Sequence, residues 1–257
     1  MFLPSFDLKG KTAVVSGAGR GIGRAIAIGL AEAGADVALL ARTEQDLKET
    51  SSIIEKLGRK TLVLPTDVTK RDQVHNSISA VSSEWGKIDI LVNNAGMNIR
   101  SKALEATDEE WQTIMDTNLK SAFMMSQEAG KIMKEQDTGG KIINIASVAG
   151  QVALRTGVAY AATKAALMQM TKVLAMEWGQ YGINVNSIGP WYFKTPLTEK
   201  LLADEAYVQD ILAVTPLKRI GELPELVGPV VFLSSDAGNY VTGQTLFVDG
   251  GMTIHGF

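Results

Sequence analysis

The order of local patterns along the chain constrains its fold more than any other feature. Short apolar runs alternate with longer segments of helical periodicity from end to end. Several runs are apolar at successive positions, as in parallel strands that are covered on both faces. The runs predict strands at 12–16, 37–41, 61–64, 88–92, 141–146, 184–188 and 245–248. The periodic segments predict helices at 20–33, 44–57, 70–85, 108–136, 158–180 and 222–234.

Strand–helix alternation of this kind predicts an α/β fold, with a doubly wound, seven-stranded parallel sheet and helices on both faces. No repeat, low-complexity tract or Pro/Gly-rich linker divides the chain, so one domain over residues 1–257 is expected. Residues 190–215 interrupt the alternation with only short helical patches. A long segment after a strand is often functional, so we expect a lid here; a surface insertion without function is the alternative.

Composition excludes several classes of function. A net charge of −3, with lysines and arginines scattered, gives no footprint for nucleic acid. The absence of cysteine excludes disulfides and cysteine-based metal or nucleophilic sites. His75 and His255 lie away from the motifs described below, so no metal site is predicted. No apolar stretch approaches the ~20 residues that span a bilayer, and the apolar N-terminus is too short for a signal sequence. A soluble, cytoplasmic protein is expected.

Gly17, Gly21 and Gly23 lie directly after the first predicted strand and open the next predicted helix. Glycines allow a tight turn and a close approach of the backbone to a ligand. The N-terminus of a helix presents unpaired N–H groups and a positive dipole end. Because position 22 is Ile, the spacing differs from the commoner Gly-x-Gly-x-x-Gly fingerprint. In this setting the cluster predicts a pyrophosphate site; a tight strand–helix turn is the alternative.

The end of the second strand is expected to meet the adenosine ribose of a dinucleotide. An acidic residue there would bind the ribose hydroxyls and repel a 2′-phosphate, but the strand ends in Ala41 and Arg42. Arg42 can offer a planar fork to a phosphate, and Arg20 in the glycine loop is a second candidate cation. We therefore expect NADP (NADPH) as cofactor, with NAD as the alternative. A solvated Arg42, with Glu44 nearby, is the competing interpretation.

Tyr160 and Lys164 are four residues apart, and Ser147 precedes the tyrosine by thirteen positions. Positions i and i+4 of a helix share a face, so the phenol and the ammonium are expected side by side. A neighbouring cation lowers the pKa of a tyrosine, which would let Tyr160 exchange a proton with a substrate oxygen. Ser147 would hold the same oxygen by a hydrogen bond. An exposed lysine beside a half-buried tyrosine is the alternative.

These motifs occur in an order that resembles the short-chain dehydrogenase/reductase family, over about residues 7–251. The resemblance implies a Rossmann-type sheet and hydride transfer between a nicotinamide and a secondary alcohol or ketone. Besides the glycine cluster and the serine–tyrosine–lysine set, it rests on four further motifs: Asp67-Val68, Asn93-Asn94-Ala95-Gly96, Asn118 and Val248-Asp249-Gly250-Gly251.

The resemblance also implies a role for each matching residue. Tyr160 would be the general acid/base, Ser147 would position the substrate oxygen, and Lys164 would lower the pKa of the tyrosine and bind the nicotinamide ribose. Asn118 would hold a water that links the lysine to solvent; a helix-kink residue without catalytic part is the alternative. The expected cofactor site comprises Gly17, Arg20, Gly21, Ile22, Gly23, Arg42, Asp67, Val68, Asn93, Ala95, Gly96, Tyr160, Lys164, Pro190 and Thr195.

Residues 96–100 and 191–199 are similar to gluconate 5-dehydrogenases and related sugar-acid members of the family. This likeness implies reversible oxidation of a secondary alcohol on a sugar acid such as gluconate. Arg100 or Arg155 would pair with the substrate carboxylate. A reductase of β-ketoacyl thioesters or small ketones is the nearest alternative, and a cofactor-binding sensor without catalysis is an alternative of a different class.

Trp191 departs from the family pattern, in which glycine usually follows Pro190. A bulky indole there would narrow the cleft or reposition the lid, so Trp191 joins Ser147 and the two arginines as a candidate substrate contact. By the same family resemblance, the helices predicted at 108–136 and 158–180 would pair across a dimer interface, and two dimers would form a homotetramer. Packing of these helices onto their own sheet is the alternative.

Overall fold

The structure, a computed structural model, describes residues 2–254, so His255 lies outside the described residues. Seven strands form one sheet in the order β3-β2-β1-β4-β5-β6-β7, and all neighbouring strands are parallel. This confirms the predicted sheet. The strands are β1 (Thr12–Ser16), β2 (Asp36–Ala41), β3 (Thr61–Pro65), β4 (Ile90–Asn93), β5 (Gly140–Ile145), β6 (Ile183–Pro190) and β7 (Thr245–Val248).

Helices connect the successive strands. They are α1 (Gly21–Glu32), α2 (Glu44–Lys56), α3 (Arg71–Trp85), α4 (Asp108–Met115), α5 (Ser121–Glu135), α6 (Val158–Trp178), α7 (Glu199–Leu202), α8 (Glu205–Ala213) and α9 (Leu223–Ser234). The two short helices α7 and α8 lie in the segment predicted to be a lid. Across residues 2–254, every helix is too short or too polar to span a bilayer.

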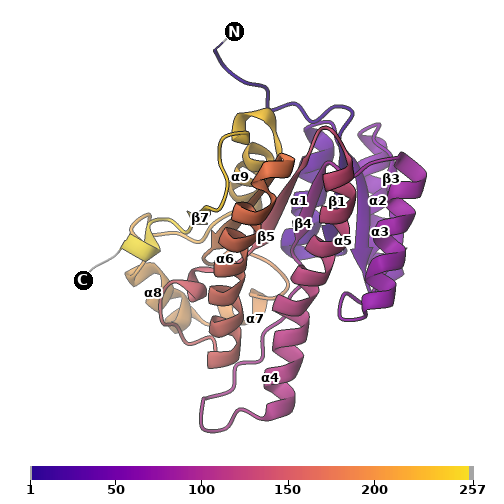
Figure 1. The fold of residues 1–257 in the computed structure, drawn as a ribbon. Coiled ribbons are helices and arrows are strands. Elements are labelled where there is room, and N and C mark those ends of the chain that lie inside the picture. Colours follow the sequence, from indigo (N-terminus) through magenta and orange to yellow (C-terminus); the bar gives the residue numbers. More distant parts are fainter. Residues whose placement is uncertain (1, 255–257) are drawn as a thin grey trace.

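Helices cover both faces of the sheet (Figure 1), and an apolar core lies beneath the helices on each face. On one face α1, α2 and α9 cover side chains such as Val15 and Leu39. On the other face α3, α5 and α6 cover Val14 and Leu40. Successive strand residues point to opposite faces, and all four of these side chains are fully buried. Each contributes about 1.5–3 kcal/mol by burial, which is why the strands read as uninterrupted apolar runs.

The strand order reverses direction at β1 and β4, which predicts a ligand crevice at their carboxyl ends. From β1 the chain runs outward to β2 and β3, and α3 then carries it back across the sheet to β4, on the other side of β1. Connections that leave neighbouring strands in opposite directions open a crevice that binds ligands in folds of this type. The glycine turn after β1 and the long segment 94–107 after β4 both lie at this point.

The helix predicted at 108–136 is interrupted. α4 ends at Met115, residues 116–120 form a π-helical turn, and α5 begins at Ser121. The helical periodicity continues through this turn, so the pattern predicts one helix where the structure has two. The turn directs Asn118 inward, where it is 1% exposed. Single π-helical turns are frequent at functional sites.

Candidate active site

The glycine loop between β1 and α1 requires glycine at three positions. Gly17 has a φ of 66° and Gly21 a φ of 56°, in the left-handed region that L side chains rarely adopt. Gly23 is required for a different reason, because a Cβ atom there would lie 2.2 Å from the carbonyl oxygen of Gly17. The loop therefore has the shape of a backbone cradle, as the sequence predicts.

Asn94 and Ser16 hold the glycine loop against the end of β4. The Asn94 Nδ2 atom donates to the carbonyl oxygens of Ser16 and Gly17, at 3.1 and 3.3 Å. The Ser16 Oγ atom accepts from the backbone N–H groups of Asn94 and Ala95, at 3.0 and 3.1 Å. Arg24 adds a link, since its Nε donates to a loop carbonyl oxygen at 2.8 Å. The sequence analysis missed these supporting roles; a polar residue ending an apolar strand is the signal that identifies Ser16.

The N-terminus of α1 is open to a ligand. Its N-cap residue, Arg20, has an extended backbone and makes no side-chain cap hydrogen bond. The first N–H groups of the helix are therefore available to an anion, which the dipole also attracts. Thr195, in the predicted lid segment, faces this point, because its Cβ lies 3.7 Å from where a Cβ on Gly21 would be. Ile22 packs against the core instead, beneath the turn.

Arg42 and Asp67 lie near each other beyond the carboxyl ends of β2 and β3. Burial raises the pKa of Asp67, but hydrogen bonds from Thr69 and the charges of Lys70 and Arg42 outweigh it, so this pKa is lowered. Arg42 is exposed at this edge of the sheet, and Val68 beside Asp67 is buried. With Asp67 bound to Thr69, the exposed cation is the group available to a ribose phosphate.

Asn93 has an interior position that differs from its predicted role at the cofactor cleft. Its Nδ2 atom donates to Ser126 Oγ and to Asn144 Oδ1, each at 2.8 Å, and the residue is 4% exposed. The side chain therefore joins β4 to β5 and α5 inside the core, which leaves only its backbone to face a ligand. Gly96 is close to the catalytic helices, since a Cβ there would lie 3.3 Å from Asn118 Oδ1.

Ser147, Tyr160 and Lys164 meet beyond the carboxyl end of β5. The Ser147 Oγ accepts from the backbone N–H of Ala149 at 3.1 Å, which leaves the hydroxyl proton free to donate. The Ser147 side chain lies close enough to Tyr160 to lower the pKa of the phenol in part. Tyr160 and Lys164 lie in the first two turns of α6, and the Lys164 Nζ is 5.5 Å from the centroid of the tyrosine ring. The structure thus brings the predicted trio together.

Burial dominates the protonation of Tyr160. Burial raises the pKa of its phenol, and the Ser147 hydrogen bond and the charge of Arg100 lower it only in part. Lys164 is 5% exposed, burial lowers the pKa of its ammonium to about 8, and its Nζ donates to the carbonyl oxygen of Ile145 at 2.7 Å. The expectation that Lys164 leaves Tyr160 with a lowered pKa is therefore wrong for this structure, because desolvation outweighs the neighbouring charges.

Asn118 fastens the loop after β4 to the catalytic helix. Its Oδ1 accepts from the backbone N–H of Met97, and its Nδ2 donates to the carbonyl oxygen of the same residue, both at 2.8 Å. Nδ2 also lies 3.4 Å from the Oγ1 of Thr163, the residue before Lys164. Asn118 thus lies in a helix kink and also contacts the catalytic region, while its predicted role in holding a water stays a prediction.

The two candidate arginines have different surroundings. The Arg155 side chain is 76% exposed and pairs with Asp210 at 2.9 Å. The Arg100 Nη1 donates to the carbonyl oxygen of Arg155 at 2.9 Å and to the hydroxyl of Tyr207 at 3.4 Å. The charge of Arg100 also lowers the pKa of Tyr160. Of the two arginines, Arg100 is therefore the one whose charge affects the pKa of the Tyr160 phenol.

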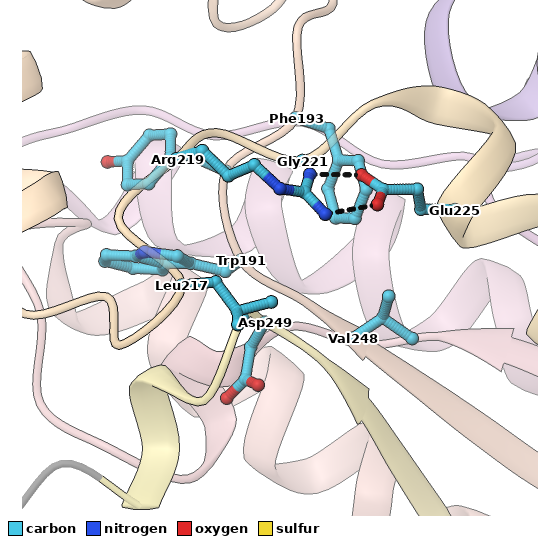
Figure 2. Close-up of a pocket in the computed structure, with 10 residues that line it drawn as sticks. Trp191, Phe193, Leu217, Arg219, Gly221, Glu225, Val248 and Asp249 are labelled. Atoms are coloured by element: carbon cyan, nitrogen blue, oxygen red, sulfur yellow. Dashed lines mark hydrogen bonds and ion pairs between the residues drawn. The ribbon is translucent and has the colours of Figure 1, made fainter.

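Trp191 lies at the start of the predicted lid segment, next to Pro190 at the end of β6. The indole Nε1 donates to Thr215 Oγ1 at 3.0 Å, and the ring meets that of Tyr192 edge-on, with centroids 4.5 Å apart. The indole also lines a cavity of about 100 Å³ (Figure 2). Other side chains around the cavity come from the segment after α8 and from the end of β7: Leu217, Arg219, Val248 and Asp249. Contact of Trp191 with a substrate stays a prediction.

The assembled site can perform one kind of chemistry well. A glycine cradle with an open helix N-terminus lies on the same edge of the sheet as a phenol, a donating hydroxyl and a buried ammonium. Such a set can hold a phosphate-bearing dinucleotide and exchange a proton with an alcohol or carbonyl oxygen beside it.

Comparisons with known proteins agree with this geometry. A family model described as Enoyl-(Acyl carrier protein) reductase matches residues 17–253. The chain is 44% identical over 252 residues to the 2-dehydro-3-deoxy-D-gluconate 5-dehydrogenase of Escherichia coli (strain K12), covering 98% of each chain. It is 42% identical over 250 residues to the gluconate 5-dehydrogenase of Gluconobacter oxydans (strain 621H), covering 97% of each. The structure of a gluconate 5-dehydrogenase from Burkholderia cenocepacia J2315 in complex with NADP and tartrate is 39% identical, with a TM-score of 0.93 and 97% of both chains covered.

Proposed function

Because the chain belongs to the short-chain dehydrogenase/reductase family, we propose that it is an NADP-dependent oxidoreductase of sugar acids. It interconverts a secondary alcohol and a ketone, and gluconate with its keto form is the favoured substrate pair. The observation that carries the choice of substrate is Arg100, whose cationic charge reaches the phenol of Tyr160. A carboxylate held there leaves the substrate's carbinol end near the acid/base.

The described residues fit a phosphorylated dinucleotide. The glycine cradle and the uncapped N-terminus of α1 would hold its pyrophosphate, and Arg42, with Arg20 as a second cation, would pair with a 2′-phosphate. Asp67 and Val68 would border the adenine, and Thr195 of the lid would contact the phosphates or the carboxamide. When bound, NADP supplies the hydride acceptor. NAD is the alternative cofactor and would leave Arg42 without its phosphate.

The chain's own residues carry the proton. In the oxidation direction, the Tyr160 phenolate takes the proton of the substrate hydroxyl, and in the reduction direction the phenol returns it. The Ser147 hydroxyl, with its oxygen already engaged by Ala149, donates to the same substrate oxygen and holds it beside the phenol. Lys164 remains anchored on Ile145, from where its ammonium would bind the nicotinamide ribose hydroxyls.

The test is to follow NADPH formation or consumption spectrophotometrically, with NAD(H) in parallel, over sugar acids, polyols, ketoacyl thioesters and simple ketones. Turnover of gluconate or its keto form with NADP(H), at a higher kcat/KM than any neutral polyol, is expected. Turnover of ketoacyl thioesters without turnover of sugar acids would contradict the substrate class. Faster turnover with NAD than with NADP would contradict the cofactor preference.

We also infer a cytoplasmic homotetramer. The helices expected at the subunit interface expose apolar side chains, among them Phe123 at 38%, Val173 at 40% and Met176 at 77%. Exposed apolar side chains on helices that cover the same face of the sheet favour a partner surface, and closed symmetry is the usual outcome. Light scattering after size-exclusion chromatography tests the assembly, and fractionation of cells that express the protein tests its location.

A further inference from the structure

Two tyrosine side chains from different parts of the lid meet above Arg100. Tyr192 lies just after β6 and Tyr207 lies on α8, and their hydroxyl oxygens are 2.5 Å apart. The Arg100 Nη1 lies 3.4 Å from the Tyr207 hydroxyl. Burial lowers the pKa of the guanidinium, but the nearby phenols of Tyr192 and Tyr207 outweigh it, so this pKa is raised. Three polar groups from three segments of the chain therefore converge at one point.

A count of the hydroxyl protons in this cluster shows that it has more hydrogen-bond donors than acceptors. The two phenols carry two hydroxyl protons, but only one proton can lie between their oxygens. The other O–H is therefore free to donate, whichever of Tyr192 and Tyr207 is the donor within the pair. Arg100 cannot accept it, because a guanidinium has only N–H donors. The cluster thus presents a cation and a phenolic donor, and what it lacks is an acceptor.

The phenols remain donors at working pH. Burial raises the pKa of Tyr192 to about 12, and its hydrogen bond with Tyr207 acts in the same direction. The charge of Arg100 lowers this pKa only in part, so the phenol keeps its proton and does not neutralise the guanidinium. A planar carboxylate is the acceptor that matches such a set, because its two oxygens can take an N–H from a guanidinium and an O–H from a phenol together.

The cluster lies within reach of the reacting centre. The charge of Arg100 lowers the pKa of Tyr160. The backbone of the same loop packs against the start of α6, since a Cβ on Gly157, three residues before Tyr160, would lie 3.7 Å from the Arg100 Cα. A molecule whose anionic end pairs with Arg100 would therefore have its other end available to the catalytic phenol.

We propose that Tyr192 and Tyr207 complete, with Arg100, a receptor for the substrate carboxylate, and that the two phenols select sugar acids over neutral polyols. The inference rests on the proposed function and extends it to two tyrosines of the predicted lid, of which Tyr207 was not a candidate from the sequence. Because Tyr207 lies on α8, binding of the carboxylate also joins the lid to the loop after β4.

The experiment compares Tyr192→Phe and Tyr207→Phe with the parent enzyme on gluconate and on a neutral polyol, with NADP saturating. Each variant removes one hydroxyl and keeps the ring. Loss of a hydrogen bond to a carboxylate lowers affinity about tenfold or more, so KM for gluconate is expected to rise about tenfold while kcat changes less than about threefold. The kinetic constants for the polyol are expected to stay unchanged.

Asp210→Asn is the matched control, because it weakens the Arg155–Asp210 pair that joins α8 to the segment before α6 and leaves both phenols in place. It is expected to keep the preference for gluconate. Equal losses on acid and polyol in the tyrosine variants would show a structural role and overturn the proposal, as would an unchanged KM for gluconate.

A second readout separates this proposal from the proposed function. Tartrate, a hydroxylated dicarboxylate, is titrated into the NADP-saturated protein and its affinity is measured by calorimetry. If gluconate is not turned over but tartrate binds the parent enzyme and binds the two variants about tenfold more weakly, the substrate assignment fails and the receptor stands. If the parent and the variants bind tartrate equally, the receptor fails whatever the enzyme oxidises.

Discussion

The Nζ atom of Lys164 lies 5.5 Å from the ring centroid of Tyr160 and donates to the carbonyl oxygen of Ile145 at 2.7 Å. The spacing of four residues therefore brings the ammonium to the phenol without hydrogen bonding the two groups to each other within the described chain. Burial acts on both in opposite directions, since it raises the pKa of the phenol and lowers that of the ammonium. Both groups are thus held closer to their neutral forms than in water.

Replacing Tyr160 by Phe should abolish turnover while cofactor binding survives. The variant keeps the ring and its packing but loses the hydroxyl that exchanges the proton. General acid/base groups contribute about 10²–10⁴-fold, so kcat should fall by at least about 100-fold. Fluorescence titration with NADPH should give a Kd within about threefold of the parent. Retained turnover would remove Tyr160 from the proton transfer.

The raised pKa of Tyr160 predicts opposite pH profiles for the two directions. Oxidation uses the phenolate, so kcat/KM for gluconate should increase with pH through the neutral and alkaline range until the pKa of the phenol is passed. Reduction uses the phenol, so its kcat/KM should be level at neutral pH and fall only at alkaline pH. Because the charge of Arg100 lowers this pKa, Arg100→Met should move both profiles to higher pH, when oxidation is measured on a neutral polyol and reduction on its ketone.

The buried Lys164 should make stability depend on pH in a defined window. Its pKa is about 8 in the folded protein, whereas a lysine exposed to water, as in the unfolded chain, has a pKa of 10.5. Between these values the unfolded chain holds a proton that the folded chain has lost, so the free energy of unfolding rises with pH. Relative to Lys164→Met, the parent should gain on the order of 1–2 kcal/mol between pH 7.5 and 9.5, measured by urea denaturation.

Lys172 supplies the control for that measurement. It lies on the same helix, α6, and its side chain is exposed, so Lys172→Met should follow the parent's pH dependence within about 0.5 kcal/mol. An equal pH dependence in the parent and in Lys164→Met would show that the ammonium at position 164 retains its usual pKa in the folded protein.

The strands and the catalytic spacing could be read from the sequence because both depend on local patterns. Residues 12–16 and 245–248 were predicted with the bounds that the structure has, since short apolar runs flanked by glycine or polar residues are typical of strands. The break at residues 116–120 could not be predicted in this way. The contacts of Asn118 with Met97 that accompany it join residues 21 positions apart, and the periodicity on either side is unchanged.

The contacts of the two candidate arginines could not be predicted from the sequence either. Arg100 and Arg155 look alike as cations near the motifs, and they differ only through partners in the lid, Tyr207 and Asp210, which are 107 and 55 positions away. Their distinction requires the fold. The same holds for the pKa of Tyr160, because the number of residues between two groups does not report how far each is removed from water.

The position of Arg42 predicts a cofactor switch. Arg42→Ala should raise KM for NADP about tenfold or more, because a charge-assisted pair with the 2′-phosphate is lost. It should leave KM for NAD within about twofold, since that cofactor lacks the phosphate. Steady-state kinetics with both cofactors checks this difference, and an equal change for both would place Arg42 outside the 2′-phosphate site.

Gly23 and Gly228 give a matched pair that separates the glycine cradle from helix propensity. Both lie inside helices, α1 and α9. A Cβ at Gly23 would lie 2.2 Å from the Gly17 carbonyl oxygen and 2.4 Å from Asn94 Nδ2, whereas a Cβ at Gly228 meets nothing within 4 Å. Alanine stabilises a helix by about 1 kcal/mol relative to glycine. Any loss of stability in Gly23→Ala must therefore come from the clash of its Cβ with the glycine loop.

Gly228→Ala should therefore leave NADP affinity unchanged and raise the free energy of unfolding by up to about 1 kcal/mol. Gly23→Ala should lower it by about 1–3 kcal/mol, because the clash is with backbone and cannot be relieved by a rotamer change. It should also weaken NADP binding at least about tenfold, since the loop that Asn94 holds must move. Calorimetric titration and urea denaturation measure the two effects. Full affinity in Gly23→Ala would show that the cradle tolerates a displaced loop and that α1 alone holds the phosphates.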